Sequence, residues 1–341
     1  MLICRLAAIV TGLLLVTCVL HAAVIEVPGD HPTIQEGVNA AAEGDTVLVD
    51  HGTYAGPLNR SISFLGINRC LVSKDGADST IIDCEQADRA FLFGTGETEA
   101  SIVDGFTVVN GGGRPFNGGA IYIYGASPTI RNCVFRQNTA ADAGAVLCLY
   151  SSSTISDCTF VDNSANSQFG GALACSYSSP VVTGCTFSGN AAPAGSAIRM
   201  YDSSGSINDC TIVGNSTTEY GVIRFDISST TAITNTIVAF NTHGIPIHCA
   251  GGSVPTTTHC VVFGNAEGDS LSGSYHDNLF VDPLLCDMYG GNFSLCADSP
   301  CLPGSLGNPW GELVGACDQG CAECGSAVEQ TTWGVMKGMY R

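Results

Sequence analysis

Apolar and polar residues alternate along the middle of the chain in a unit that is written four times between Gly118 and Asn215. Each unit holds a small-residue turn, a run with an apolar residue at every second position, a corner rich in Ser, Gly or Pro, and a second apolar run. Alternation with a period of two predicts a β-strand with one buried face. The alternating pairs are Ile121 and Ile123, Val146 and Cys148, Leu173 and Cys175, Ile198 and Met200, and Ile223 and Phe225.

The second run of every unit contains a Cys, and an Asn follows it five residues later. Successive Cys positions are 25, 27 and 25 residues apart, and a fixed period of this size is typical of a solenoid. Two to three short strands per turn predict a parallel β-helix, and parallel crossovers are almost always right-handed. We therefore predict an all-β, right-handed parallel β-helix of roughly ten coils, stacked ~4.8 Å apart. The repeated positions are Cys133, Cys158, Cys185, Cys210, Asn138, Asn163, Asn190, Asn215, Asn241 and Asn265.

Both repeated columns are expected to be structural. Asn tolerates the left-handed backbone of a tight turn, and stacked Asn amides can hydrogen-bond from coil to coil. Stacked Cys side chains lie ~4.8 Å apart with parallel Cβ vectors, whereas a disulfide needs Cβ atoms ~3.8 Å apart, so we expect reduced thiols in the core. The spacing before the Cys breaks strict alternation, which predicts a bend near Asn132, Asp157 and Asp209.

Residues 1–23 differ in character from the rest of the chain. A positive charge, an apolar stretch from Leu6 to Leu20 and small residues at the end predict a secretory signal peptide. The following segment contains the capping box Thr33-x-x-Glu36, which predicts a short helix from about Ile34 to Ala42. That helix would cover the open N-terminal end of the solenoid.

The stretch TIQEGVNAAAEGDTVLVDHGTYAG, which begins at Thr33, resembles the start of right-handed β-helix proteins of the pectin-lyase-like superfamily. Repeat elements such as Gly119-Ala120-Ile121 and Phe135 to Asn138 are similar to those of polymorphic outer membrane proteins. The resemblance covers roughly residues 27 to 316 and implies the fold. It implies little about function, because the superfamily holds lyases, hydrolases, esterases and non-catalytic surface proteins. We predict a β-helix with its N-terminal cap over residues 24–316, and a Cys-containing linker and C-terminal tail over residues 317–341.

The chain departs from the pattern of the superfamily's polysaccharide-cleaving members. For a lyase, the resemblance implies an acidic calcium cluster beside an Arg that acts as base, and for a hydrolase a tight trio of Asp. Asp157 and Asp209 occupy equivalent places two coils apart, about 10 Å, beyond the ~6.5–9.5 Å of an inverting pair. Gly184 stands at that place in the coil between them. We therefore expect no metal or cofactor, with calcium only if the chain is a lyase.

The chain is acidic, with 31 Asp and Glu against 12 Lys and Arg and a net charge of −19. This charge repels nucleic acid and anionic membranes, which argues against both as partners. Outside residues 1–23, no stretch approaches the ~18 continuous apolar residues of a membrane helix, so no membrane span is expected.

The C-terminal part of the chain is dense in Cys. In an exported protein we expect these residues to staple the last coil by disulfides. The spacing Cys317-x3-Cys321-x2-Cys324 also resembles an iron–sulfur site of radical enzymes, and zinc is a third alternative; we favour neither. The residues concerned are Cys286, Cys296, Cys301, Cys317, Cys321 and Cys324.

Side chains that point outward from the first strand of each unit form two columns. One column reads Tyr122, Leu147, Ala174, Arg199, Arg224, and the other Tyr124, Leu149, Ser176, Tyr201, Asp226. Two guanidinium groups one coil apart are costly unless an anion or carboxylates lie between them. In one interpretation the face binds a sugar acid, because Tyr rings can stack on the sugar and Arg can bind its carboxylate. In the other, the Arg side chains form ion pairs with neighbouring Asp and the face is purely structural. The candidate ligand-binding face is Tyr122, Tyr124, Arg199, Tyr201, Asp202, Arg224 and Asp226.

Taken together, these patterns predict an exported protein that is secreted or held at the cell surface. We expect a non-catalytic protein that binds a polysaccharide or another cell-surface component. The alternatives are a polysaccharide lyase or glycoside hydrolase that works on an outward strand face, and a purely structural rod.

Overall fold

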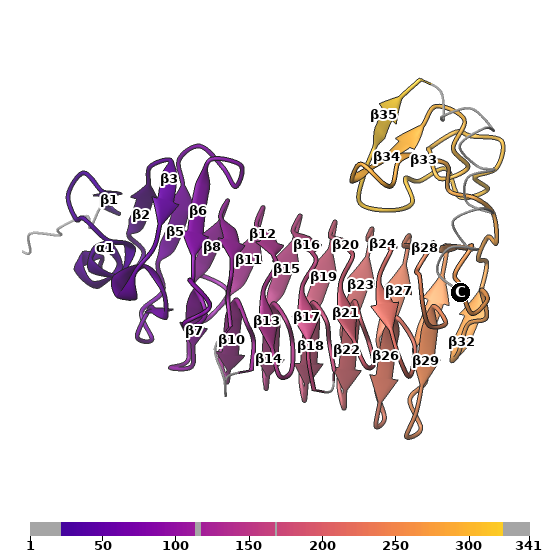
Figure 1. The fold of residues 1–341 in the computed structure, drawn as a ribbon, viewed down its shortest axis with the longest axis horizontal. Coiled ribbons are helices and arrows are strands. Elements are labelled where there is room, and N and C mark those ends of the chain that lie inside the picture. The colour runs from indigo at the N-terminus through magenta and orange to yellow at the C-terminus, as the bar shows by residue number, and fades with distance from the viewer. Residues whose placement is uncertain (1–21, 113–116, 168, 323–341) are drawn as a thin grey trace, which may run out of the picture.

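The computed structural model describes residues 22–112, 117–167 and 169–322, so the predicted signal peptide lies outside the described residues. The chain winds into a parallel β-solenoid of about 12 turns, slightly more than the roughly ten predicted. Figure 1 shows the turns stacked side by side along one axis, with the chain progressing from one end of the rod to the other. No helix in the described part of the chain is long and apolar enough to cross a membrane.

Three long sheets form the walls of the solenoid. The first has 11 strands, in the order β1 Val24–Val27, β2 Thr46–Val49, β5 Cys70–Ser73, β8 Ile102–Asp104, β11 Thr129–Arg131, β15 Thr154–Ser156, β19 Val181–Thr183, β23 Ser206–Asn208, β27 Ala232–Thr234, β30 Thr256–Thr258 and β32 Ser274–His276. The second has nine, in the order β3 Gly52–Tyr54, β6 Thr80–Asp83, β9 Thr107–Val109, β12 Val134–Arg136, β16 Thr159–Val161, β20 Thr186–Ser188, β24 Thr211–Val213, β28 Ile237–Ala239 and β31 Val261–Phe263.

The third wall carries the candidate site described below. It has eight strands, in the order β4 Ile62–Ser63, β7 Phe91–Phe93, β10 Ile121–Tyr124, β14 Val146–Leu149, β18 Leu173–Ser176, β22 Ile198–Tyr201, β26 Ile223–Asp226 and β29 Ile247–Cys249. A small sheet beside it consists of β13 Thr139–Ala140, β17 Ser164–Ala165, β21 Ala191–Ala192 and β25 Ser216–Thr217.

The core fills the interior of the solenoid with the inward residues of all three walls. The alternating pairs of the repeat, such as Ile121 and Ile123, are fully buried. Equivalent residues of consecutive coils stack on one another: the ring centroids of Phe135 and Phe160 are 5.0 Å apart, and those of Phe160 and Phe187 4.7 Å. The period-two pattern therefore identified the buried face correctly.

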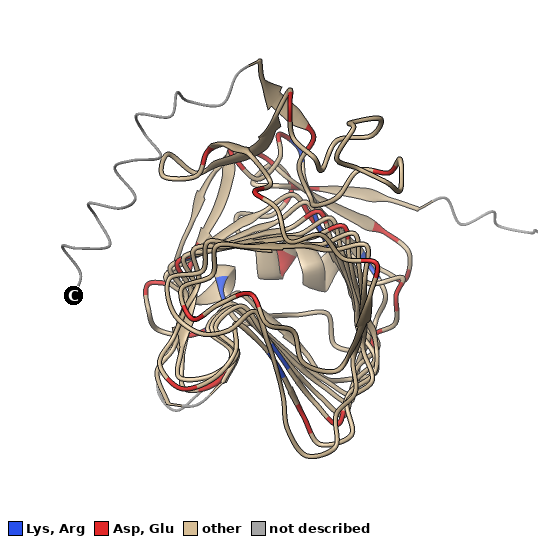
Figure 2. Cartoon of the chain, turned by 90° about the vertical axis from the view of Figure 1, so that its right-hand side faces the viewer, with Lys and Arg blue, Asp and Glu red and all other residues tan. Residues whose placement is uncertain are grey.

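Helix α1, Ile34–Ala40, closes the N-terminal end of this core. Thr33 caps it by accepting a hydrogen bond from the Glu36 N–H and donating one to the Glu36 carboxylate. Ile34 and Val38 are fully buried in the core. In Figure 2, a view along the solenoid axis, the helix lies across the opening of the coils. The helix ends two residues before the predicted Ala42.

A ladder of buried Asn side chains ties the coils together. Asn163 shows the pattern: its Oδ1 accepts from the backbone N–H and the Nδ2 of Asn138, and its own Nδ2 donates to the Asn190 Oδ1. All six predicted Asn take part, through Asn265. The predicted reason for Asn was partly wrong. The left-handed residue of the turn is the one before the Asn, for example Asp162 with φ 54°.

A second ladder, of buried Ser, was not predicted. The Oγ of each Ser accepts the backbone N–H of the equivalent Ser one coil earlier. Ser is common in exposed corners as well as buried ones, so its position in the repeat carried no signal of burial. The ladder consists of Ser151, Ser178, Ser203, Ser229 and Ser253.

The four Cys of the repeat are reduced and buried, as predicted. Each thiol donates to backbone carbonyls; Cys185, for example, contacts the oxygen of Ile155 in the previous coil at 3.6 Å and that of Thr183 at 3.3 Å. The bend before each Cys is also confirmed, because Asn132, Asp157 and Asp209 adopt left-handed φ values of 52° to 53°.

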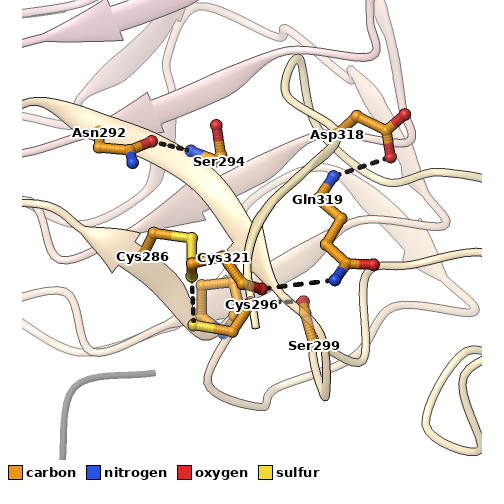
Figure 3. The surroundings of a disulfide bond; sticks show 9 residues. Cys286, Asn292, Ser294, Cys296, Ser299, Asp318, Gln319 and Cys321 are labelled. Carbon is orange, nitrogen blue, oxygen red and sulfur yellow. Dashed lines mark hydrogen bonds between the residues drawn. A yellow bond between two sulfur atoms is a disulfide. The ribbon is translucent and has the colours of Figure 1, made fainter. Parts of the chain in front are cut away.

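A small C-terminal lobe follows the last coil. Strands β33 Leu285–Asp287, β34 Asn292–Cys296 and β35 Gln319–Cys321 form a sheet of its own. Cys286 and Cys321 are joined in a disulfide across it, and the Cys296 sulfur lies 3.5 Å from that of Cys321 (Figure 3). The expected stapling by disulfides is therefore confirmed for Cys286 and Cys321, within this sheet rather than in the last coil. It is wrong for Cys301 and Cys317, which are free thiols, and Cys324 lies outside the described residues. The division of the chain into domains stays a prediction.

The Gly-Gly-Ala element of the repeat marks a close approach between coils. A Cβ atom on Gly119 would press on the carbonyl of Gly144, one on Gly144 on that of Gly171, and one on Gly171 on that of Ser196. Backbone atoms cannot move aside as a flexible side chain can, so a larger residue at these three positions would overpack the contact.

We expect Asn190→Ala to lower the free energy of unfolding by about 2–4 kcal/mol, because several buried polar groups lose partners at about 1–3 kcal/mol each. The orphaned groups include the N–H of Asn163 and the carbonyl of Phe160. Chemical denaturation measures the change. Asn166→Ala, at an exposed position one coil earlier, serves as the control; equal effects of the two substitutions would refute the role given to the ladder.

We expect Gly144→Ala to destabilise the fold by about 1–3 kcal/mol, the usual cost of overpacking. The new methyl group would meet the backbone of Gly171 and Ser164. Gly94→Ala is the matched control, because the nearest atom to its Cβ would be 3.9 Å away. Thermal or denaturant unfolding compares the two variants, and an unchanged stability of Gly144→Ala would contradict the close approach.

Candidate functional site

The outward side chains of the eight-stranded wall form one unbroken column along the rod. Strand register pairs each member with the next, from one end of the wall to the other. The column changes character along its length, being polar and aromatic near the N-terminal end, apolar in the middle and cationic near the C-terminal end. Its members are Ser63, Leu92, Tyr122, Leu147, Ala174, Arg199, Arg224 and His248.

The loops that precede these strands fold back over the middle of the column. A Cβ atom on Gly170 would lie 2.7 Å from the Cβ of Ala174, and one on Gly118 would lie 3.2 Å from that of Leu147. Leu147 and Ala174 are consequently buried although they lie outside the solenoid, where they pack with Ala143 in a small apolar cluster. The outer face is therefore covered at its centre.

The two Arg of the column share one carboxylate. Nε of Arg199 lies 3.2 Å from Asp226, and Nη2 of Arg224 lies 2.8 Å from it. The side chains of Arg199 and Arg224 are only 14 % and 12 % exposed. Asp226 is the carboxylate that separates the two guanidinium groups. Asp202 is exposed, and in the described part of the chain it makes no ion pair with either Arg.

Three aromatic rings, two of them from loops, cover this ion cluster. The guanidinium of Arg199 lies 3.9 Å from the ring centroid of Phe169 and 4.8 Å from that of Tyr201. Arg224 lies 4.2 Å from the ring of Tyr220. Phe169 and Tyr220 were missed from the sequence because they belong to loops of irregular length, outside the alternating pattern.

Two titratable groups border the cluster. Burial raises the pKa of the Asp142 carboxyl, although the charge of Arg199 acts in the opposite direction. Burial, reinforced by the charge of Arg224, lowers the pKa of His248. Three buried atoms have no hydrogen-bond partner among the described residues: Asp142 Oδ1, His248 Nδ1 and Arg224 Nη1. The cluster therefore holds two cations beside two carboxylates, in a setting where further charge is disfavoured.

Four Tyr side chains run along the edge of the same wall. The ring centroids are 5.8 Å apart for Tyr124 and Tyr150, 5.1 Å for Tyr150 and Tyr177, and 5.5 Å for Tyr177 and Tyr201. Tyr124 and Tyr201 were expected on this face. Tyr150 and Tyr177 stand one residue further along their coils, so the aligned columns did not include them.

An apolar hollow of about 340 Å³ opens beside the first of these rings. One face of Tyr122 within it is covered by the guanidinium of Arg89, at 5.1 Å. Tyr124 stands half exposed at the hollow. The lining residues are Ser63, Leu92, Gly94, Thr95, Tyr122 and Tyr124.

A second, open hollow of about 930 Å³ lies near the N-terminal end, between β2 and β3 and the turn after β5. Asp50, His51 and Asp75 meet there with their ligand atoms within 4.8 Å of one another, so they could hold a metal ion. Lys74 competes for the same carboxylates: its ammonium lies 3.1 Å from Asp50, and that hydrogen bond raises the pKa of Lys74. The other group in the described residues that could ligate a metal is Cys286, Cys296 and Cys321, which contains the disulfide.

Comparison with known proteins identifies the fold. The family described as "Right handed beta helix region" matches residues 68–229 and 119–282, which together span more than half of the chain. The solved structure of pectate lyase Pel9A is similar over 87 % of this chain and 96 % of its own, with a TM-score of 0.50 and 12 % identity. The A-module of the mannuronan C-5 epimerase AlgE6 of Azotobacter vinelandii matches over 73 % of this chain and 95 % of its own, with a TM-score of 0.25 and 13 % identity. No curated protein sequence matches.

We expect Asp226→Asn to destabilise the protein by roughly 3 kcal/mol, because removing one partner of a buried ion pair leaves an uncompensated charge. Here two guanidinium groups would lose their shared carboxylate. Asp202→Asn is the matched control, since that carboxylate is exposed one coil earlier. Denaturant unfolding at neutral pH measures both variants. A loss no larger than that of the control would show that the cluster does not depend on Asp226.

Proposed function

Since the chain belongs to the family of right-handed β-helix regions, we propose that it is a non-catalytic protein that binds carbohydrate through the hollow at Tyr122 and Tyr124. The fold alone says nothing about the ligand. The observation that carries the proposal is the composition of the hollow. An exposed aromatic ring stands beside apolar wall residues and two hydroxyl groups, those of Ser63 and Thr95.

This combination suits a sugar ring. The apolar face of a pyranose packs on an aromatic ring, and its hydroxyl groups exchange hydrogen bonds with Ser and Thr. A volume of about 340 Å³ lies at the small end of the usual range for ligand sites, about 300–1,000 Å³. Tyr124 is the expected stacking residue, because its ring is half exposed, whereas Tyr122 already has Arg89 on one face.

The lining of the hollow supports binding rather than cleavage. Glycoside hydrolysis ordinarily uses a pair of carboxylates, and the lining residues include none. At the other end of the wall, Arg199 and Arg224 are already paired with Asp226 and covered by aromatic rings. This arrangement favours the structural interpretation of that part of the candidate face over a site for a sugar acid.

A polysaccharide lyase is the second candidate, and one observation favours it. The hollow at Asp50 brings two carboxylates, a His and a Lys together, and such a set could hold a cation and supply a base. Secretion, or retention at the cell surface, is part of the proposal for either function. It is supported by the apolar N-terminal segment of the sequence.

We expect the protein to be retarded by at least one neutral or acidic polysaccharide in affinity electrophoresis, and Tyr124→Ala to weaken that binding. An aromatic contact contributes about 0.5–1.5 kcal/mol, so the affinity should fall about 2- to 12-fold. Tyr275→Ala is the matched control, because this Tyr is similarly exposed but lies on β32, outside the hollow. Equal loss in the two variants would contradict the assigned site.

The same polysaccharides, incubated with the protein in calcium or in chelator, test the second candidate. Unsaturated or reducing-end fragments would overturn the non-catalytic proposal. Their loss in Lys74→Ala would place the chemistry at the Asp50 hollow, and their loss in Arg199→Ala would place it on the eight-stranded wall.

A further inference from the structure

Tyr150 and Tyr177 occupy the same turn position in consecutive coils, directly after β14 and β18. Both residues adopt the left-handed backbone with φ 52°. An identical backbone conformation one coil apart directs the two side chains the same way. The equivalent residues of the flanking coils are Gly125 and Asp202, so the pair is bounded on both sides.

The two rings form a parallel stack at the surface. Their centroids are 5.1 Å apart and their planes differ by 9°. The contacts of the pair with its neighbours are different, since Tyr124 meets Tyr150 at 83° and Tyr201 meets Tyr177 at 76°. Of these three contacts, the one within the central pair is the one in which the two rings are parallel and face each other. Tyr150 is 56 % exposed and Tyr177 45 % exposed, so a reagent in solution reaches both rings.

Because each ring covers a face of the other, the pair is poorly suited to sugar stacking. It is suited to a reaction between the two rings. We propose that Tyr150 and Tyr177 are an oxidative modification site, at which a peroxidase-type one-electron oxidant joins them as dityrosine.

The chemistry balances with hydrogen peroxide as the terminal oxidant. The oxidant removes one electron and one proton from each phenol, and the two electrons and two protons reduce one peroxide to two waters. The two phenoxyl radicals combine through the carbons ortho to oxygen, which forms one C–C bond. Each of those carbons then passes its hydrogen to the neighbouring oxygen as a proton, and both rings become aromatic phenols again. The pair loses two hydrogen atoms in all.

The surroundings favour hydrogen-atom loss over prior ionisation. A hydrogen bond with Tyr201, reinforced by the nearby charge of Asp202, raises the pKa of Tyr177. The phenol therefore keeps its proton at neutral pH, and the proton leaves together with the electron. The bond would join two adjacent coils on the outside of the rod, where in the described part of the chain no disulfide links them.

The test treats the full chain, at low concentration, with a haem peroxidase and hydrogen peroxide. We expect dityrosine fluorescence in the monomer band. Peptide mapping should find a linked peptide that carries Tyr150 and Tyr177 and has lost two hydrogen atoms. The treated protein should unfold at a higher denaturant concentration than the untreated one. Tyr150→Phe and Tyr177→Phe should each reduce the intramolecular product to background.

Tyr275→Phe is the matched control and should leave the product unchanged, because that exposed ring lies outside the stack. The proposal would be overturned if the variants at Tyr150 and Tyr177 kept the product. It would also be overturned by links that form mainly between chains, or mainly within the Tyr124–Tyr150 or Tyr177–Tyr201 pairs. Glycan binding is measured on the same samples, so that loss of the cross-link and loss of the Tyr124 site are distinguished.

Discussion

The whole structure depends on keeping consecutive coils in register, and buried side-chain hydrogen bonds do much of this. Backbone pairing between parallel strands would tolerate a slip, but a slipped Asn or Ser ladder would leave a row of polar groups buried without partners. The Asn163 amide, for example, contacts both the coil before it and the coil after it. A unique register is what lets the outward side chains form columns, and the features of the eight-stranded wall are such columns or the loops that cover them.

Much of the architecture was predictable because every coil of a solenoid repeats the same pattern of buried and exposed side chains. Alternating Ile, Val and Leu identified the buried strands, and the Cys and Asn columns fixed which residues are equivalent in different coils. The Ser ladder was not predictable, since nothing in the residue type distinguishes a Ser that bonds the next coil from one that faces water. For Asn, the predicted hydrogen bonds between coils are present, but the left-handed backbone belongs to the preceding residue.

The site was less predictable than the fold for a physical reason. Sequence alignment of coils gives the direction of a strand residue, but it does not give the path of the loops between strands. Phe169 and Tyr220 come from such loops, and they turn Arg199 and Arg224 from an exposed pair into a covered ion cluster. Tyr150 and Tyr177 are displaced by one residue from the aligned column, and that single step decides that they stack on one another.

The Asn ladder begins at Asn138 and ends at Asn265, so it spans only part of the rod. In the described part of the chain, the coils nearer the N-terminus pair through backbone bonds and scattered side-chain contacts, without a continuous Asn ladder. A solenoid transmits load from turn to turn, because each turn touches only its neighbours. Tension applied between the two ends would therefore meet a rod of uneven strength, in which the coils from Asn138 to Asn265 hold together more firmly than the coils outside them.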